Sequence, residues 1–306
     1  MKFHPSVLEG RSGLEAFTAL IRGYFDQKGS HMQFNVVSRE TLLDAQKHPE
    51  KYATLQVRVC GWNEYFVKMS KAKIMFYIGA GLEGVINKSK PIFDKHEIEL
   101  VELSTYLKLC KQSSDGYEYL TEEDNKIMGL ADTHVWLDPL RMLTMSEIVL
   151  EKVSEIDPEN KEFYQTNFEN LKERLEKLDN EFKIKLNDQT YEKVIMVDHD
   201  SYLYWEERYG IKRIRTRIDN ESCDATPSNI ETNIELARQY NIKYIVTTSN
   251  ETVCGIIDKY ASTLEAEIVE LNHLSTLYKT DVEEMRDYFK IMYDNLNTLL
   301  KILPKK

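Results

Sequence analysis

Apolar residues follow a helical spacing at the start of the chain and a strand-like spacing soon afterwards. In residues 6–28 they recur every three or four positions, which predicts an amphipathic helix. Two apolar, β-branched stretches follow at 31–38 and 55–67, and a short helix is predicted between them at 39–52. The pattern therefore predicts a small α/β unit that closes near Ser70.

After residue 70 strand patterns and helix patterns alternate. The predicted elements are, in order, strand 73–81, helix 81–95, strand 98–104, a polar loop at 111–129, and helices over 140–186 that break at 157–160. Strand and helix then alternate again from residue 191 to a final helix over 281–303. Because this order builds parallel sheets, we predict an α/β fold with two parallel-sheet lobes joined by a long helix.

Composition narrows the functional classes. The formal net charge of −11 and the lack of a dense basic run argue against a nucleic-acid surface and favour a cationic ligand. No stretch approaches the roughly 20 apolar residues of a membrane span, and the first residues contain no continuous apolar signal core. We therefore expect a cytoplasmic chain. The four cysteines are widely spaced, which predicts reduced, structural thiols.

Three histidines share one position in the predicted fold. His134, His199 and His273 fall at or just beyond the ends of predicted strands, where ligands of parallel sheets bind. A lone histidine is more often structural, but three at the same edge indicate a site. Neutral imidazole nitrogens on rigid supports suit Zn²⁺ or Mn²⁺, and the residues alone leave the choice between these metals open.

Three motifs carry a resemblance to a known family. The segments FYIGAGLEGVINK, DTHVWLDP and VDHDSYLYWEERYGI occur in this order, with a long helix between the second and third. Together they resemble the substrate-binding proteins that deliver zinc or manganese to ABC transporters, over residues 71–303. The resemblance implies metal ligands at His134 and His199, a preference for zinc over manganese, an ABC metal permease as partner, and relatives that work outside the cytoplasm.

The same resemblance implies an incomplete site. The family's first histidine precedes the strand at 73–81, in a segment whose place is taken here by residues 1–70. The family's last ligand is usually acidic, whereas this chain has Asn272 at about that position, with His273 beside it as either a substitute ligand or a surface histidine. His4, His31 and Glu83 are further candidates that nothing in the sequence places. We therefore predict a truncated first lobe and a weakened metal site.

Residues 1–70 resemble a different family. The stretch from His31 to Val67, with its RVCGW core, resembles the C-terminal glycyl-radical segment of pyruvate formate-lyase-like enzymes. In that family the core glycine holds the radical, which maps to Gly61. Glycine is required because no side chain twists the radical out of the plane of its flanking amides. The resemblance implies an activating enzyme with an iron-sulfur cluster and S-adenosylmethionine, or a glycyl-radical enzyme partner.

These observations predict four regions and leave three interpretations open. The regions are a glycyl-radical fragment (1–70), a truncated first lobe (71–139), connecting helices (140–186) and a second lobe (187–306). Because no linker separates the first two, we interpret the chain as a fusion of fragments of two genes. The leading interpretation is a metal-binding transport protein rather than an enzyme. The alternatives are a glycyl-radical enzyme fragment or autonomous radical cofactor, and a folded relic that does neither.

Overall fold

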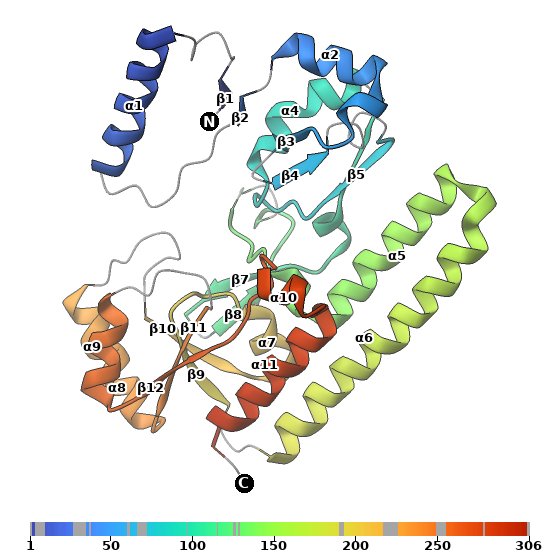
Figure 1. Cartoon of the computed structure of the whole chain (residues 1–306). Helices are drawn as coiled ribbons and strands as arrows, with labels where there is room; N and C mark the ends of the chain where they lie inside the picture. The colour runs from blue at the N-terminus through green and yellow to red at the C-terminus, as the bar shows by residue number, and fades with distance from the viewer. Residues whose placement is uncertain are drawn as a thin grey trace. The chain divides into compact units, whose positions relative to one another are not determined.

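The structure is a computed structural model of the whole chain (Figure 1). It divides into two compact units, Met1–Met75 with Glu83–Val101 and Phe76–Leu82 with Glu102–Lys306. The described residues are 2–3, 10–26, 35–36, 38–59, 62–65, 72–95, 97–114, 116–124, 127, 129–189, 193–216, 226–248, 255–277 and 279–304. No helix in these ranges is long and apolar enough to cross a membrane.

The first unit contains the helices and strands predicted near the N-terminus. Its elements are β1 (Lys2–Phe3), α1 (Gly10–Asp26), β2 (Asn35–Val36), α2 (Arg39–Lys47), η2 (Pro49–Tyr52), β3 (Gln56–Val59), β4 (Trp62–Tyr65) and α4 (Gly84–Lys95). Ser38 caps α2, since its Oγ accepts a hydrogen bond from the Thr41 backbone N at 3.0 Å. Strands β3 and β4 are antiparallel. Cys60 and Gly61, between them in the sequence, lie outside the described residues.

A four-stranded parallel sheet forms the centre of the second unit. Its strands are β9 (Val194–Val197), β10 (Lys212–Arg215), β11 (Tyr244–Thr247) and β12 (Glu267–Glu270), in the order β10-β9-β11-β12. Every residue of β9 is buried, as expected for a central strand covered on both faces. The predicted α/β class and the parallel sheet of the second lobe are confirmed.

Helices cover both faces of this sheet (Figure 1). Ile195 and Val197 pack into a cluster with α6 (Lys161–Gln189), α7 (Leu203–Tyr209) and α11 (Tyr288–Ile302). Val194 and Met196 belong to a second cluster with α8 (Pro227–Gln239) and α9 (Gly255–Leu264). The alternation follows from the two-residue period of a strand, which sends successive side chains to opposite faces.

Two long helices, α5 (Pro139–Ile156) and α6, pack against each other beside the sheet. The predicted break between them is confirmed, because the 3₁₀ helix η6 (Pro158–Asn160) lies there. The predicted final helix is wrong at its start. It is split into α10 (Lys279–Glu283) and α11, since Met285 has a positive φ of 50° and Asp287 begins a new helix by accepting a hydrogen bond from the Lys290 backbone N.

The predicted polar loop at 111–129 is also partly wrong. It contains an antiparallel hairpin of β7 (Cys110–Ser113) and β8 (Gly116–Tyr119). Tyr117 and Tyr119 alternate with polar residues on β8, and this strand signal is short and surrounded by acidic, turn-forming residues. Hydrogen bonds from the hairpin to α7 stabilise it, including one from Tyr119 Oη to Glu207 at 2.6 Å.

A tight turn follows β5 (Ile74–Tyr77), which forms a two-stranded sheet with β6 (Glu99–Glu102). The Glu102 carboxylate holds the turn by accepting hydrogen bonds from Ala80 N at 3.0 Å, Ser104 Oγ at 3.2 Å and Tyr77 Oη at 3.1 Å. Gly79 lies against this carboxylate with φ of +86°, and a Cβ at Gly79 would be 2.1 Å from Glu102 Oε1. Only glycine fits here without displacing the carboxylate.

We predict that Gly79→Ala destabilises the second unit by about 1–3 kcal/mol, the usual cost of one strained backbone position. Urea unfolding followed by circular dichroism measures this. The matched control is Gly84→Ala at the first position of α4, where an added Cβ meets nothing within 4 Å. It should be neutral or slightly stabilising. Equal effects of the two substitutions would contradict the prediction.

Candidate metal centre

The three predicted ligand histidines lie on three different loops of the second unit. His199 follows the end of β9 by two residues, and His273 follows the end of β12 by three, as predicted. His134 does not follow a strand, since residues 129–134 form a loop that leads into the 3₁₀ helix η5 (Val135–Leu137). This part of the prediction is wrong because Asp138 and Pro139 begin helix α5 there, so the segment opens a helix.

His134 and His199 face each other through their Nε2 atoms, which are 3.4 Å apart. Zinc bonds imidazole nitrogen at about 2.0–2.1 Å, so two nitrogens on one tetrahedral ion are about 3.3–3.4 Å apart. The two rings are nearly perpendicular, with centroids 5.5 Å apart. The pair therefore has the nitrogen spacing that tetrahedral coordination of one ion requires.

Asp132 fixes the orientation of His134. One carboxylate oxygen, Oδ1, lies 2.9 Å from His134 Nδ1 and also accepts a hydrogen bond from the His134 backbone N at 2.8 Å. A proton held on Nδ1 by this carboxylate leaves the lone pair on Nε2, the atom that faces His199. The sequence prediction missed Asp132, although its position two residues before His134 was a local signal for such a pair.

His273 lies next to the pair but is held differently. Its ring stacks on that of His199 with centroids 5.0 Å apart, and its Nδ1 accepts a hydrogen bond from the Ser275 backbone N at 3.3 Å. This bond uses the Nδ1 lone pair and leaves the proton of a neutral ring on Nε2. Among the residues that the structure describes, no group of three His, Cys, Asp or Glu side chains is arranged to hold a metal ion.

The remaining sequence candidates are Gly61, His4, His31 and Glu83. Gly61, His4 and His31 lie outside the described residues. Glu83 is described, but it belongs to the first compact unit, whereas the three histidines belong to the second.

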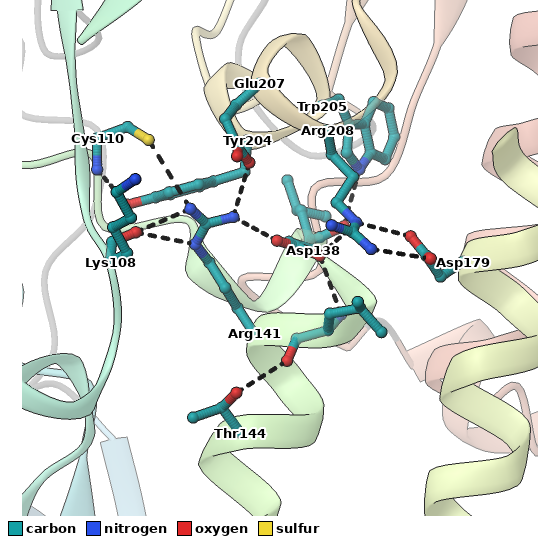
Figure 2. A network of polar contacts seen from close by, with 12 residues as sticks. Lys108, Cys110, Asp138, Arg141, Thr144, Asp179, Tyr204, Trp205, Glu207 and Arg208 are labelled. Carbon is teal, nitrogen blue, oxygen red and sulfur yellow. Dashed lines mark hydrogen bonds and ion pairs between the residues drawn. The ribbon is translucent and has the colours of Figure 1, made fainter. Parts of the chain in front are cut away.

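A buried charge network supports the loop of His134 (Figure 2). Asp138 is 1% exposed. Its carboxylate caps α5 by accepting a hydrogen bond from the Leu140 backbone N at 2.9 Å, and it forms ion pairs with Arg141 and Arg208. Burial raises the pKa of Asp138, and the two guanidinium groups oppose that shift. Asp138 belongs to the motif DTHVWLDP, and no role was predicted for it from the sequence.

The network continues from α7 to α6 through Asp179. Arg208 donates to both carboxylate oxygens, with distances of 2.7 and 2.9 Å, and Lys183 lies 2.9 Å from Oδ2. Burial by itself would raise the pKa of Asp179, but the hydrogen bonds from Arg208 and Lys183 outweigh burial and lower it. Asp179 therefore stays ionised in the folded protein at neutral pH.

One free cysteine lies at the edge of the network. Cys110 is fully buried on β7, and its Sγ is 3.8 Å from an Arg141 nitrogen. Burial raises the pKa of this thiol to about 12, although the positive charge of Arg141 acts in the opposite direction.

Two sequence families match the chain. The family described as zinc-uptake complex component A, periplasmic (ZnuA), matches residues 62–302. This match spans most of the chain, which therefore belongs to that family. The glycine radical family matches residues 1–67. Both resemblances predicted from the motifs are confirmed.

Individual relatives are either zinc-binding proteins or glycyl-radical enzymes, and each kind matches one part of the chain. The zinc-binding protein AdcA of Streptococcus pyogenes is 32% identical over 189 residues, which are 57% of this chain and 35% of AdcA. Isethionate sulfite-lyase of Oleidesulfovibrio alaskensis is 49% identical over 70 residues, 23% of this chain and 8% of the lyase. The chain thus spans about a third of the length of the first relative and less than a tenth of the second.

Solved structures share the fold. The Zn(II)-bound ZnuA-like domain of Streptococcus pneumoniae AdcA aligns with a TM-score of 0.61 and 23% identity, over 77% of this chain and 82% of that one. The metal-dependent lipoprotein YcdH of Bacillus subtilis aligns with a TM-score of 0.64 and 19% identity, over 89% and 91%. Both likenesses support a ZnuA-like α/β fold.

We predict that Asp179→Asn lowers the free energy of unfolding by about 1–3 kcal/mol at pH 6, the range for hydrogen bonds to charged groups. Because the folded pKa of Asp179 is lowered, its stabilisation is complete above the unfolded value near 4 and is lost as pH falls through the folded pKa. The difference between parent and variant should therefore shrink below pH 4.

Urea unfolding at pH 6 and pH 3 measures this difference. Asp188→Asn, an exposed position on the same helix, is the matched control and should change little at either pH. A difference for Asp179→Asn that stays constant between the two pH values would contradict the prediction.

Proposed function

We propose that this chain binds a divalent transition metal, zinc in preference to manganese, as the solute-binding component of an ABC metal-uptake system. The observation that carries the proposal is the 3.4 Å separation of the His134 and His199 Nε2 atoms. Asp132 supports the proposal because its hydrogen bond to Nδ1 leaves the lone pair of His134 on Nε2, the atom that faces His199. Membership in the zinc-uptake family provides independent support.

The ligand set explains why we propose a weakened site. Two imidazole nitrogens supply half of a tetrahedral shell, and structural zinc sites use four protein ligands. His273 is our candidate for a third ligand, which requires its ring to give up the hydrogen bond from Ser275. In the absence of further protein ligands, water completes the shell and the affinity is lower.

The proposed partner is the ABC metal permease of such a system. The family description places its members in the periplasm, and we propose the same working location for residues 71–306. We further propose the four regions defined by sequence as functional divisions, with His134 in the region 71–139 and with His199 and His273 in the region 187–306.

A second candidate function belongs to residues 1–70. We propose that Gly61 can hold a glycyl radical, as in an autonomous radical cofactor or a fragment of a glycyl-radical enzyme. The specific support is the glycine radical family match at 1–67 and the 49% identity to isethionate sulfite-lyase over 70 residues. The partners would be a radical-activating enzyme and a glycyl-radical enzyme that lacks its own radical segment.

We predict that calorimetric titration with Zn²⁺ gives one site per chain in the parent. His134→Ala and His199→Ala should each weaken binding about 100-fold or more, since loss of a ligand should exceed the 10–100-fold cost of changing an outer hydrogen-bond partner. His273→Ala should weaken binding less, because its Nδ1 is already hydrogen-bonded.

His48→Ala is the matched control for this titration. His48 lies in the first unit with a side chain that is 47% exposed, and its removal should leave the affinity unchanged. No heat in the parent protein would sink the proposed function. If neither His134→Ala nor His199→Ala changes the affinity for Zn²⁺, the metal binds at another place in the chain.

For the second function, we predict an electron paramagnetic resonance doublet after anaerobic treatment with a radical-activating enzyme and S-adenosylmethionine. The doublet arises from coupling of the unpaired electron to the remaining α-hydrogen of Gly61. Gly61→Ala is the test variant and Gly10→Ala the control, since both lie in residues 1–70 and only Gly61 is in the RVCGW core. Absence of the signal with a competent activating enzyme would remove this claim.

A further inference from the structure

Tyr204 connects the two loops that carry His134 and His199. Its side chain is fully buried, and its hydroxyl donates a hydrogen bond of 2.7 Å to the backbone carbonyl of Asp132. The same oxygen accepts a hydrogen bond from the Cys110 backbone N at 3.4 Å (Figure 2). The hydroxyl therefore has a donor role and an acceptor role, and both are used.

Tyr204 lies close to His199 in the chain, so its hydrogen bond to Asp132 links the two histidine loops. Tyr204 is in the first turn of α7, five residues after His199. Asp132, at the other end of the bond, holds His134 through its carboxylate. The hydrogen bond from Tyr204 thus joins the segment that follows His199 to Asp132, the residue that orients His134.

A second bond from α7 reaches the same loop but at a different point. The Trp205 indole donates to the Leu137 carbonyl at 2.8 Å, three residues beyond His134. That bond anchors the end of η5, whereas the Tyr204 bond acts on the residue whose side chain contacts the imidazole. Of the two, Tyr204 is the one placed to control the direction of the His134 ring.

The surroundings of Tyr204 keep its hydroxyl protonated and hold its ring in position. Burial raises the pKa of this phenol, so the group keeps its proton and remains a donor at neutral pH. The Arg141 guanidinium lies 4.3 Å from the ring centroid, a cation–π contact that fixes the ring (Figure 2). Arg141 is in turn held by Asp138 and Glu207.

We propose that Tyr204 is a positioning residue that holds the Nε2 atoms of His134 and His199 at the separation for coordination of one ion. The inference rests on the proposed metal-binding function and adds a residue that acts through the backbone of Asp132. Without the hydroxyl, the Asp132 carbonyl loses its donor, the loop relaxes, and the His134 ring samples other orientations.

The test uses Tyr204→Phe in the full chain, titrated calorimetrically with Zn²⁺. The expected result is a 10–100-fold loss of affinity, the usual effect of removing a hydrogen-bond partner behind a metal ligand. Titration with Co²⁺ adds a spectroscopic readout: the visible absorption of the tetrahedral ion should change in position or intensity in the variant. A merely structural role would lower the melting temperature without changing that spectrum.

Tyr260→Phe is the matched control. Tyr260 is also fully buried, but it belongs to the cluster on the other face of the sheet, and its hydroxyl contacts Asn233 and the Thr216 carbonyl. Its affinity for Zn²⁺ should stay within about twofold of the parent. Incorporation of 4-aminophenylalanine at position 204 restores a donor and should recover most of the affinity, which also tests the inference if the phenylalanine variant folds poorly.

A metal-independent measurement separates failure of this inference from failure of the proposed function. Nitrogen-15 NMR of the imidazoles in metal-free protein should show His134 with its proton on Nδ1 in the parent and a mixture of tautomers in Tyr204→Phe. If the parent gives no heat with zinc, the proposed function fails while this comparison still decides the role of Tyr204. An unchanged tautomer together with an unchanged affinity would overturn the inference.

Discussion

Burial of the Asp138 carboxylate is the constraint on which the rest of the second unit depends. A buried carboxylate is costly unless charged partners surround it, and here the partners come from two helices, Arg141 on α5 and Arg208 on α7. Arg208 also reaches α6 through Asp179. The single requirement that this charge be neutralised therefore fixes three helices relative to one another, and α7 is the helix that follows His199.

The geometry of the proposed metal site depends on that arrangement. His134 and His199 are 65 residues apart in the sequence, and neither loop by itself specifies where the other imidazole lies. Asp132 and α7 hold the two loops that carry these imidazoles. Side chains held in this way lose less conformational freedom when they bind a ligand.

The sequence predicted the features that depend on local pattern. Strand and helix alternation identified the parallel sheet, and the turn residues at 157–160 marked the break between α5 and α6. Prediction from the sequence failed for features that are set by contacts between residues far apart in the chain. The β7–β8 hairpin is stabilised by α7, about 90 residues further on, and the carbonyl of His273 is bonded to Trp136, 137 residues away. The direction of the His273 ring could not be read from a one-dimensional pattern, whereas Asp132 beside His134 could have been.

The burial of Cys110 has a consequence for the chemistry of the whole unit. Burial raises the pKa of this thiol to about 12, so the thiol keeps its proton at pH 7, whereas the thiolate is the form that binds soft metals and reacts with oxidants. The Cys110 thiol, which could otherwise compete for zinc, thus stays protonated, although the Cys110 backbone is hydrogen-bonded to Tyr204. The second unit should consequently tolerate changes of redox environment at this sulfur.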